Sequence, residues 1–188
     1  MTAITNPISL WHRLRANESR WCLRANALCD RRTTLRFFAA VSRLGDGVFW
    51  YALMAMLALF GGAPGRAAAL HMIVVGAVSL VLYKALKAGT RRPRPCAADL
   101  RIRARVAPLD EFSFPSGHTL HAVAFTIVTL AYVPALAWLL IPFAASVAAS
   151  RVVLGLHYPS DVLAATGLGS ALAAGSLWVR EDVVGLLV

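Results

Sequence analysis

The sequence predicts an all-α membrane protein: a polytopic bundle of about five to six membrane-spanning helices, preceded by an amphipathic helix at the membrane surface. Of the 188 residues, 59% are hydrophobic and only 15% are charged, and the mean hydropathy is +0.64. This composition is too apolar for an ordinary soluble domain of this length. The apolar residues also gather in runs close to the ~20 residues that cross ~30 Å of hydrocarbon.

The N-terminal region mixes leucine and tryptophan with arginine over residues 8–29. This pattern suits an amphipathic helix in the headgroup layer, with its arginines near anionic lipid. A solvent-exposed helix that caps the bundle is the alternative. We assign residues 1–45 to this basic interfacial segment and residues 46–188 to the helical bundle. Because no polar stretch of roughly 100 residues could form a second soluble domain, residues 1–188 are predicted to be one domain.

Five apolar runs follow, at residues 47–62, 67–83, 117–133, 135–150 and 162–179. Residues 119–149 contain no charged residue and are too long for one crossing, so a tight hairpin is expected near Pro134. In the last run, small residues recur every four positions and predict a packing seam with a neighbouring helix. These residues are Gly167, Ala171 and Gly175.

Two basic blocks hold 16 of the 19 lysines and arginines, eight in residues 1–45 and eight in residues 84–111. Two predicted spans separate the blocks, which places both on one side of the membrane, and the positive-inside rule makes that side cytoplasmic. We therefore expect an integral protein of a bacterial inner membrane with its site on the cytoplasmic face. Nucleic acid is not an expected partner, because the basic residues flank spans and form no base-reading module.

Three polar strings carry the candidate chemistry: Lys87 to Pro95, Pro115 to His118, and Ser150 to Asp161. A phosphoryl group in transfer spreads negative charge over three oxygens, so its catalysis requires converging cations. Arg94 and Arg151 can each direct two parallel donors at phosphate oxygens, and Lys87 supplies a compact charge. Arg91 and Arg92 could take part of this role or contact lipid headgroups.

The second string ends a polar loop and opens an apolar helix, where unpaired backbone N–H groups favour an anion. Ser116 adds a hydroxyl donor, and Gly117 allows the backbone to come close to a phosphate. His118 lies at the edge of this predicted site. From there it could donate a proton to the leaving oxygen.

The third string places His157 just before Pro159, which suits the first turn of a helix and would put Asp161 in that turn. Asp161 is expected to accept a hydrogen bond from one imidazole nitrogen, leaving the other nitrogen free to attack phosphorus. The predicted chemistry is in-line attack by His157 and a phosphohistidine intermediate. His118 would protonate the leaving group and then activate the hydrolytic water.

The sequence indicates the roles of the other titratable residues less specifically. His71 and His121 lie within apolar runs and are interpreted as hydrogen-bonded packing residues rather than catalysts. Asp46 is interpreted as part of a turn before the first run, or as a partner for an arginine of the catalytic loop.

Asp110 and Glu111 precede the second string, where they either orient Lys87 or Arg94 or remain exposed in a loop. The three cysteines show no metal-ligand spacing and are interpreted as free thiols or packing residues, and no metal or other cofactor is expected. They are Cys22, Cys29 and Cys96.

The three strings resemble the signature of the type 2 phosphatidic acid phosphatase (PAP2) family, KxxxxxxRP, PSGH and SRxxxxxHxxxD, without a gap or substitution. The resemblance covers about residues 84–180. It implies an α-helical bundle, His157 as nucleophile, His118 as acid and base, and no metal. The implied phosphate-binding residues are Lys87, Arg94, Ser116, Gly117 and Arg151. Membrane members of this family commonly have six spans and an extracytoplasmic site, which differs from the expectations above.

The predicted function is therefore metal-independent hydrolysis of a lipid phosphate or diphosphate, because a site at the ends of membrane helices favours a phosphate on a lipid tail. Candidate substrates are undecaprenyl or another polyprenyl diphosphate, phosphatidylglycerophosphate, phosphatidic acid and a phosphorylated glycolipid. One alternative is an enzyme like the vanadate-dependent haloperoxidases, which are largely soluble and so fit uncharged spans poorly. The other is a non-catalytic protein that binds or transports lipid phosphates. Membrane lipids are the expected partners, and no oligomeric state is predicted.

Overall fold

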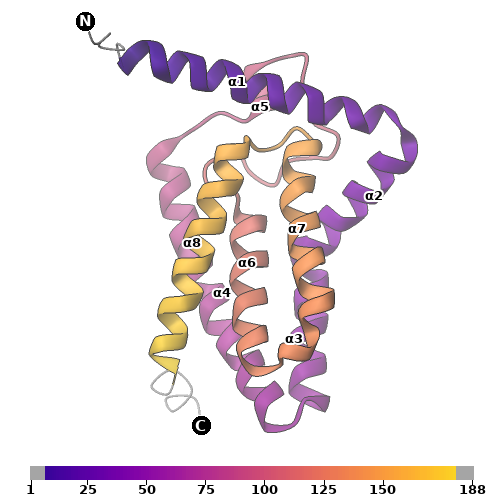
Figure 1. The fold of residues 1–188 in the computed structure, drawn as a ribbon, viewed down its shortest axis with the longest axis vertical. Coiled ribbons are helices and arrows are strands. Elements are labelled where there is room, and N and C mark those ends of the chain that lie inside the picture. Colours follow the sequence, from indigo (N-terminus) through magenta and orange to yellow (C-terminus); the bar gives the residue numbers. More distant parts are fainter. Residues whose placement is uncertain (1–6, 181–188) are drawn as a thin grey trace, which may run out of the picture.

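The computed structural model describes residues 7–180, with side chains from residue 17 onward. Within this range it is helical and contains no strand, which confirms the all-α prediction. The helices, in chain order, are α1 (Pro7–Ala27), η1 (Leu28–Asp30), α2 (Arg32–Arg43), η2 (Leu44–Val48), α3 (Phe49–Phe60), α4 (Gly62–Thr90), α5 (Pro95–Ala98), α6 (Gly117–Tyr132), η3 (Pro134–Leu136), α7 (Ala137–Val153) and α8 (Pro159–Trp178). The long helices α3, α4, α6, α7 and α8 run side by side, and α1 crosses one end of the bundle (Figure 1).

Each of the five predicted apolar runs coincides with a helix of this bundle. Three segments are long and apolar enough to cross a membrane, namely Arg32–Phe60, Gly62–Thr90 and Pro134–Val153. These segments support an integral membrane protein. Crossings by α6, which has 16 residues, and by α8 stay predictions.

The first spanning segment begins earlier than the sequence indicated. The chain is helical from Arg32 to Phe60, so the boundary placed at residue 45 falls inside this segment rather than at its end. A kink at Gly47, whose φ of 127° is in the range that favours glycine, separates its two halves. Helix α1 coincides with the predicted N-terminal helix, and its place in the headgroup layer stays a prediction.

Local sequence signals explain where the site-bearing helices begin and end. Helix α4 ends where Arg91 adopts a left-handed conformation and its N–H bonds back to the carbonyl of Lys87. Helix α6 begins after Ser116, whose side chain accepts the N–H of Thr119 as an N-cap. The expected hairpin near Pro134 joins α6 to α7. These ends place the polar strings beside one another.

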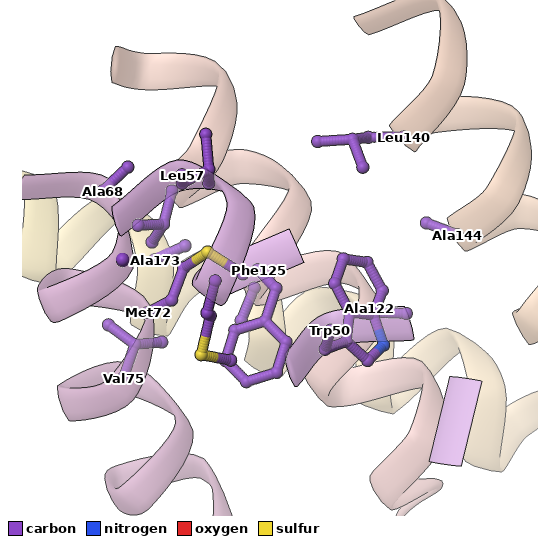
Figure 2. Close-up of a cluster of buried hydrophobic side chains, with 14 of the residues drawn as sticks. Trp50, Leu57, Ala68, Met72, Val75, Ala122, Phe125, Leu140, Ala144 and Ala173 are labelled. Carbon is purple, nitrogen blue, oxygen red and sulfur yellow. The ribbon is translucent and has the colours of Figure 1, made fainter. Parts of the chain in front are cut away.

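The apolar core lies among α3, α4, α6, α7 and α8. Trp50 and Met72 are buried, and the ring of Trp50 packs against Phe125 with centroids 5.4 Å apart. Figure 2 shows these three side chains among the buried aliphatic residues of the cluster. The core therefore ties α3 and α4 to α6, which begins at the second polar string.

The predicted small-residue seam on α8 lies on the wrong face. A Cβ atom built on Gly167 or Gly175 would meet no atom within 4 Å, and Ala171 is exposed. The small residues that are buried are Ala165, Gly169 and Ala173. At Gly169 a Cβ atom would lie 2.8 Å from a backbone oxygen of α6. Both sets have four-residue spacing, so spacing alone could not identify the contacting face.

Helix α1 is joined to the bundle through a buried amide. The Asn26 side chain donates to the carbonyls of Arg103 and Val153, both at 3.0 Å, and accepts the N–H of Arg103 at 3.0 Å. Only 3% of Asn26 is exposed. It satisfies three backbone groups that would otherwise lack a partner in this buried region.

We predict that Asn26→Ala lowers the free energy of unfolding by about 2–4 kcal/mol, because each buried polar group left unpaired costs ~1–3 kcal/mol. Denaturant unfolding in detergent micelles measures the change. The exposed Asn17→Ala is the control and should unfold like the wild type. Equal stabilities for the two variants would show that the Asn26 hydrogen bonds do not hold α1 in place.

Candidate active site

The three polar strings meet at a single cavity of about 630 Å³. The ends of α4, α7 and α8 that carry or adjoin these strings lie near α1 (Figure 1). Six of the eight predicted site residues line the cavity: Lys87, Arg94, Gly117, His118, Arg151 and His157. Ser116 and Asp161 do not appear in the lining and lie fully buried beside it.

His157 has one ring nitrogen fixed by the backbone and the other beside a cation. Its Nδ1 lies 2.6 Å from the carbonyl oxygen of Ser113, and its Nε2 lies 3.2 Å from Nη1 of Arg94. A guanidinium only donates and a carbonyl only accepts, so the proton belongs on Nδ1 and Nε2 carries a lone pair. Burial, followed by the positive charges of Arg151, Arg94 and Lys87, holds the pKa of His157 well below its ordinary value. The ring is therefore neutral.

Asp161 does not make the predicted hydrogen bond to His157. Its Oδ2 lies 3.7 Å from Nδ1, too far for a hydrogen bond. That oxygen instead accepts the N–H of Tyr158 at 2.8 Å, which caps the start of α8. The backbone carbonyl of Ser113 accepts the hydrogen bond from Nδ1 that Asp161 was expected to accept. Sequence could not indicate this, since every residue except proline presents the same backbone donor and acceptor.

Arg92 links the first turn of α8 to Glu18 of α1. Its guanidinium donates to Asp161 Oδ1, to Ser160 Oγ and to Glu18 Oε2, each at 2.7 Å, and stacks 4.2 Å from the ring of Tyr158. Glu18 also accepts the N–H of Ser160 at 3.0 Å. Arg92 is thus a scaffold residue and not a phosphate ligand. Sequence reasoning missed Glu18, although an acidic residue within an arginine-rich segment was a signal.

Lys87 and Arg94 converge on one carboxylate. Lys87 Nζ donates to both oxygens of Asp110, at 2.7 and 2.6 Å, and Arg94 Nη2 donates to Oδ1 at 2.7 Å. Burial alone would raise the pKa of Asp110, but the hydrogen bonds and charges of Lys87 and Arg94 lower it below the ordinary value. Of the two acidic residues in this loop, Asp110 contacts the cations and Glu111 is exposed.

Arg151 approaches the cavity from the end of α7. It is 3% exposed, and its Nη1 donates to Ser42 Oγ on α2. Its Nε has no hydrogen-bond partner among residues 7–180. A buried guanidinium with an unused donor, in the lining of a cavity, is suited to an incoming anion.

His118 is paired with a carboxylate from another helix. Its Nε2 lies 3.4 Å from Oδ1 of Asp46, and both residues line the cavity. Asp46 therefore contacts a histidine directly, and it also interacts electrostatically with Arg151, an arginine of the cavity. Ser116 uses its hydroxyl within α6, 2.9 Å from Oγ1 of Thr119, so its predicted role as a phosphate donor has no direct support here.

One part of the cavity wall is apolar. It is lined by Trp50, Gly76, Ala77, Leu80 and Phe125. His121 also lines the cavity, with its Nδ1 3.0 Å from the carbonyl oxygen of Gly117 and its Nε2 3.3 Å from that of Gly76. The cavity thus joins a group of buried cations to an apolar wall.

Among the other predicted packing residues, His71, Cys22 and Cys29 are buried and Cys96 is partly exposed. His71 Nδ1 lies 2.9 Å from the hydroxyl of Tyr132. Burial raises the pKa of the Cys22 thiol to about 12, which keeps it protonated and unreactive. Among the described side chains, residues 17–180, no three His, Cys, Asp or Glu form a group that could hold a metal ion.

Comparison with known proteins gives a family and a fold. The PAP2 superfamily model matches residues 68–184. Decaprenylphosphoryl-5-phosphoribose phosphatase of Mycolicibacterium smegmatis is 35% identical over 143 residues, covering 73% of this chain and 74% of that protein. Undecaprenyl-diphosphatase BcrC of Bacillus subtilis is 32% identical over 131 residues, covering 69% of this chain and 66% of that protein.

Phosphatidylglycerophosphatase B of Escherichia coli (strain K12) is 33% identical over 85 residues, which are 40% of this chain and only 32% of that protein. The match therefore spans about a third of that relative's length. The crystal structure of a transmembrane PAP2 type phosphatidylglycerolphosphate phosphatase from Bacillus subtilis has the same fold. It superposes with a TM-score of 0.72 at 23% identity, covering 90% of this chain and 87% of that chain.

We predict that the His157 ring stays neutral as the pH falls from about 8 to about 5.5, although a free histidine titrates near 6.5. The reason is the lowered pKa, which requires a lower pH for protonation. NMR of the protein with ¹³Cε1-labelled histidine measures this, and His157→Gln assigns the resonance. A His157 resonance that titrates at or above pH 6.5 would contradict the arrangement of cations around the ring.

Proposed function

This chain belongs to the PAP2 superfamily, and from that premise we propose that it hydrolyses a lipid phosphate or diphosphate through its own side chains, without a metal. One observation carries the proposal. The Nε2 lone pair of the neutral His157 lies 3.2 Å from Arg94, in a cavity that Lys87 and Arg151 also line. A nucleophile next to converging cations is the arrangement that phosphoryl transfer needs.

In the proposed first step, Lys87, Arg94 and Arg151 bind the phosphoryl oxygens. Nε2 of His157 attacks phosphorus in line, so a P–N bond forms as the P–O bond to the lipid breaks. His118, in its protonated form, gives a proton to the leaving oxygen. Burial, followed by the charge of Arg151, lowers the pKa of His118 to about 2, so the negative charge of the bound phosphate has to favour its protonation. The Ser113 carbonyl keeps the ring oriented through Nδ1–H.

In the second step, the now neutral His118 accepts a proton from water as the water oxygen attacks phosphorus. The P–N bond breaks, inorganic phosphate is released, and His157 recovers its lone pair. Asp161, 3.7 Å from Nδ1, favours the positive charge that the ring carries in the intermediate. Asp46, 3.4 Å from His118, favours the protonated form of that acid in the same way.

A lipid substrate is supported by the shape of the cavity and by the relatives. Beside the buried cations, the cavity has an apolar wall formed by α3, α4 and α6. Relatives are named for polyprenyl and glycerophospholipid phosphates. Undecaprenyl or another polyprenyl diphosphate, phosphatidylglycerophosphate and phosphatidic acid are therefore the candidate substrates.

The proposed location is a bacterial inner membrane, with the site at the cytoplasmic face. Support comes from the two basic blocks. Asn26 of α1 bonds to Arg103, and Asp30 of η1 bonds to Arg105, in the loop that also carries Asp110. Both blocks thus contribute to the same end of the bundle, which the positive-inside rule assigns to the cytoplasm.

Phosphate release from a panel of these lipids, measured in detergent with EDTA present, tests the function. We predict that His157→Ala loses at least ~100-fold in kcat/KM, the scale expected when a nucleophile is removed. His71→Gln, which changes a buried histidine outside the cavity lining, is the matched control and should turn over near the wild-type rate. Wild-type-like release by the His157 variant would refute the mechanism, and no release by the wild type would favour a binding or transport protein.

Asp46→Asn should slow cleavage of alkyl phosphates by about tenfold or more, because it removes the charge that favours protonated His118. The loss should be much smaller for p-nitrophenyl phosphate, whose leaving group departs without a proton. The pre-steady-state rate of leaving-group release, measured for both substrates, gives the ratio. Asp99→Asn, which changes a carboxylate in a loop pair with Arg101, is the control. An equal loss for both substrates would assign Asp46 a merely structural role.

A further inference from the structure

Lys87 and Arg94, which are proposed to bind the substrate phosphate, already bind the carboxylate of Asp110. Lys87 Nζ contacts both carboxylate oxygens of Asp110, at 2.7 and 2.6 Å, and Arg94 Nη2 contacts one of them at 2.7 Å. The side chains of Lys87 and Arg94 are only 8% and 4% exposed. The Asp110 carboxylate thus accepts hydrogen bonds from two of the residues that are predicted to bind phosphate.

A carboxylate suits this position for the reason that phosphate does. Both groups present two oxygens to paired donors, and both carry negative charge. Without an anion, Lys87, Arg94 and Arg151 would lie together at a buried site with their repulsion uncompensated. Asp110 offsets part of that charge. Substrate phosphate and the Asp110 carboxylate cannot use the same donors at once.

We propose that Asp110 is an internal ligand of the phosphate site, which a substrate must displace, and that it thereby determines which lipids bind. The proposal rests on the proposed function. A phosphomonoester or diphosphate has more charge and more acceptor oxygens than the carboxylate, so it competes well. A phosphodiester has a single charge like that of Asp110 and competes poorly. Ordinary bilayer phospholipids are diesters, so this competition excludes the lipids that surround the protein in greatest number.

The contacts of Asp110 allow the displacement without a change in the loop. Its backbone carbonyl accepts Nε of Arg94 at 2.9 Å, while its side chain is 39% exposed. Rotation of the side chain would move the carboxylate into solvent and leave the backbone anchored. Arg94 would stay in place as well, because its Nη1 donates to the carbonyl of Leu156 at 2.9 Å.

Binding of orthovanadate to the purified full chain, measured by isothermal titration calorimetry in detergent, tests the proposal independently of turnover. Asp110→Asn keeps the shape of the side chain and removes its charge. If Asp110 occupies the donors about nine-tenths of the time, the variant should bind vanadate about tenfold more tightly. Inhibition by phosphatidylglycerol, a diester, should also become stronger. Glu111→Gln changes the adjacent exposed carboxylate and should behave like the wild type.

Equal or weaker vanadate binding by Asp110→Asn, in a variant that melts cooperatively, would overturn the proposal. That result would mean that Asp110 orients the cations for substrate. Should the asparagine variant not fold, Asp110→Ser also removes the charge and carries the same expectation. Failure of the proposed function would look different, since the wild type would release no phosphate from any lipid whatever the variants bind.

Discussion

Three cations buried at one end of an apolar bundle impose the constraint on which the rest of the site depends. Lys87, Arg94 and Arg151 are 6%, 3% and 3% exposed, and unpaired charges at such positions are costly. The structure offsets the cost with the Asp110 carboxylate, the carbonyl of Leu156 and the hydroxyl of Ser42. Burial, followed by the charge of the same cations, lowers the pKa of His157, so the charge that would bind a phosphate also helps to keep the proposed nucleophile neutral.

The N-terminal helix supports the site although it lies outside the matched family region, which begins at residue 68. Glu18 contacts Arg92 and the first turn of α8, and Cys22 lies 3.8 Å from the carbonyl oxygen of His157. Asn26 bonds the loop that leads to Asp110 and the end of α7. These contacts fix the backbone next to His157, the proposed nucleophile. The position of α1 thus bears on the geometry of the cavity.

Much of the fold and most of the cavity-lining residues could be predicted from the sequence. Long apolar runs predict the positions of the helices. The residue types and spacing of Lys87, Arg94 and His157 predict which side chains line the cavity. What could not be predicted depends on contacts between distant segments. The partner of His157 Nδ1 is a backbone carbonyl, which no residue type reveals. The packing face of α8 could not be chosen, because small residues recur every four positions on two faces. Asp46 meets His118 only because a kinked helix brings it to the cavity.

The central claim is that one oxyanion would be held jointly by Lys87, Arg94 and Arg151 and attacked by Nε2 of His157. An experimental structure with orthovanadate bound tests it most directly. The account predicts vanadium bonded to Nε2 of His157, with its oxygens contacting the three cations and with the Asp110 carboxylate turned away. Vanadate bound away from His157, or bonded to another side chain while Asp110 still contacts Lys87, would contradict it.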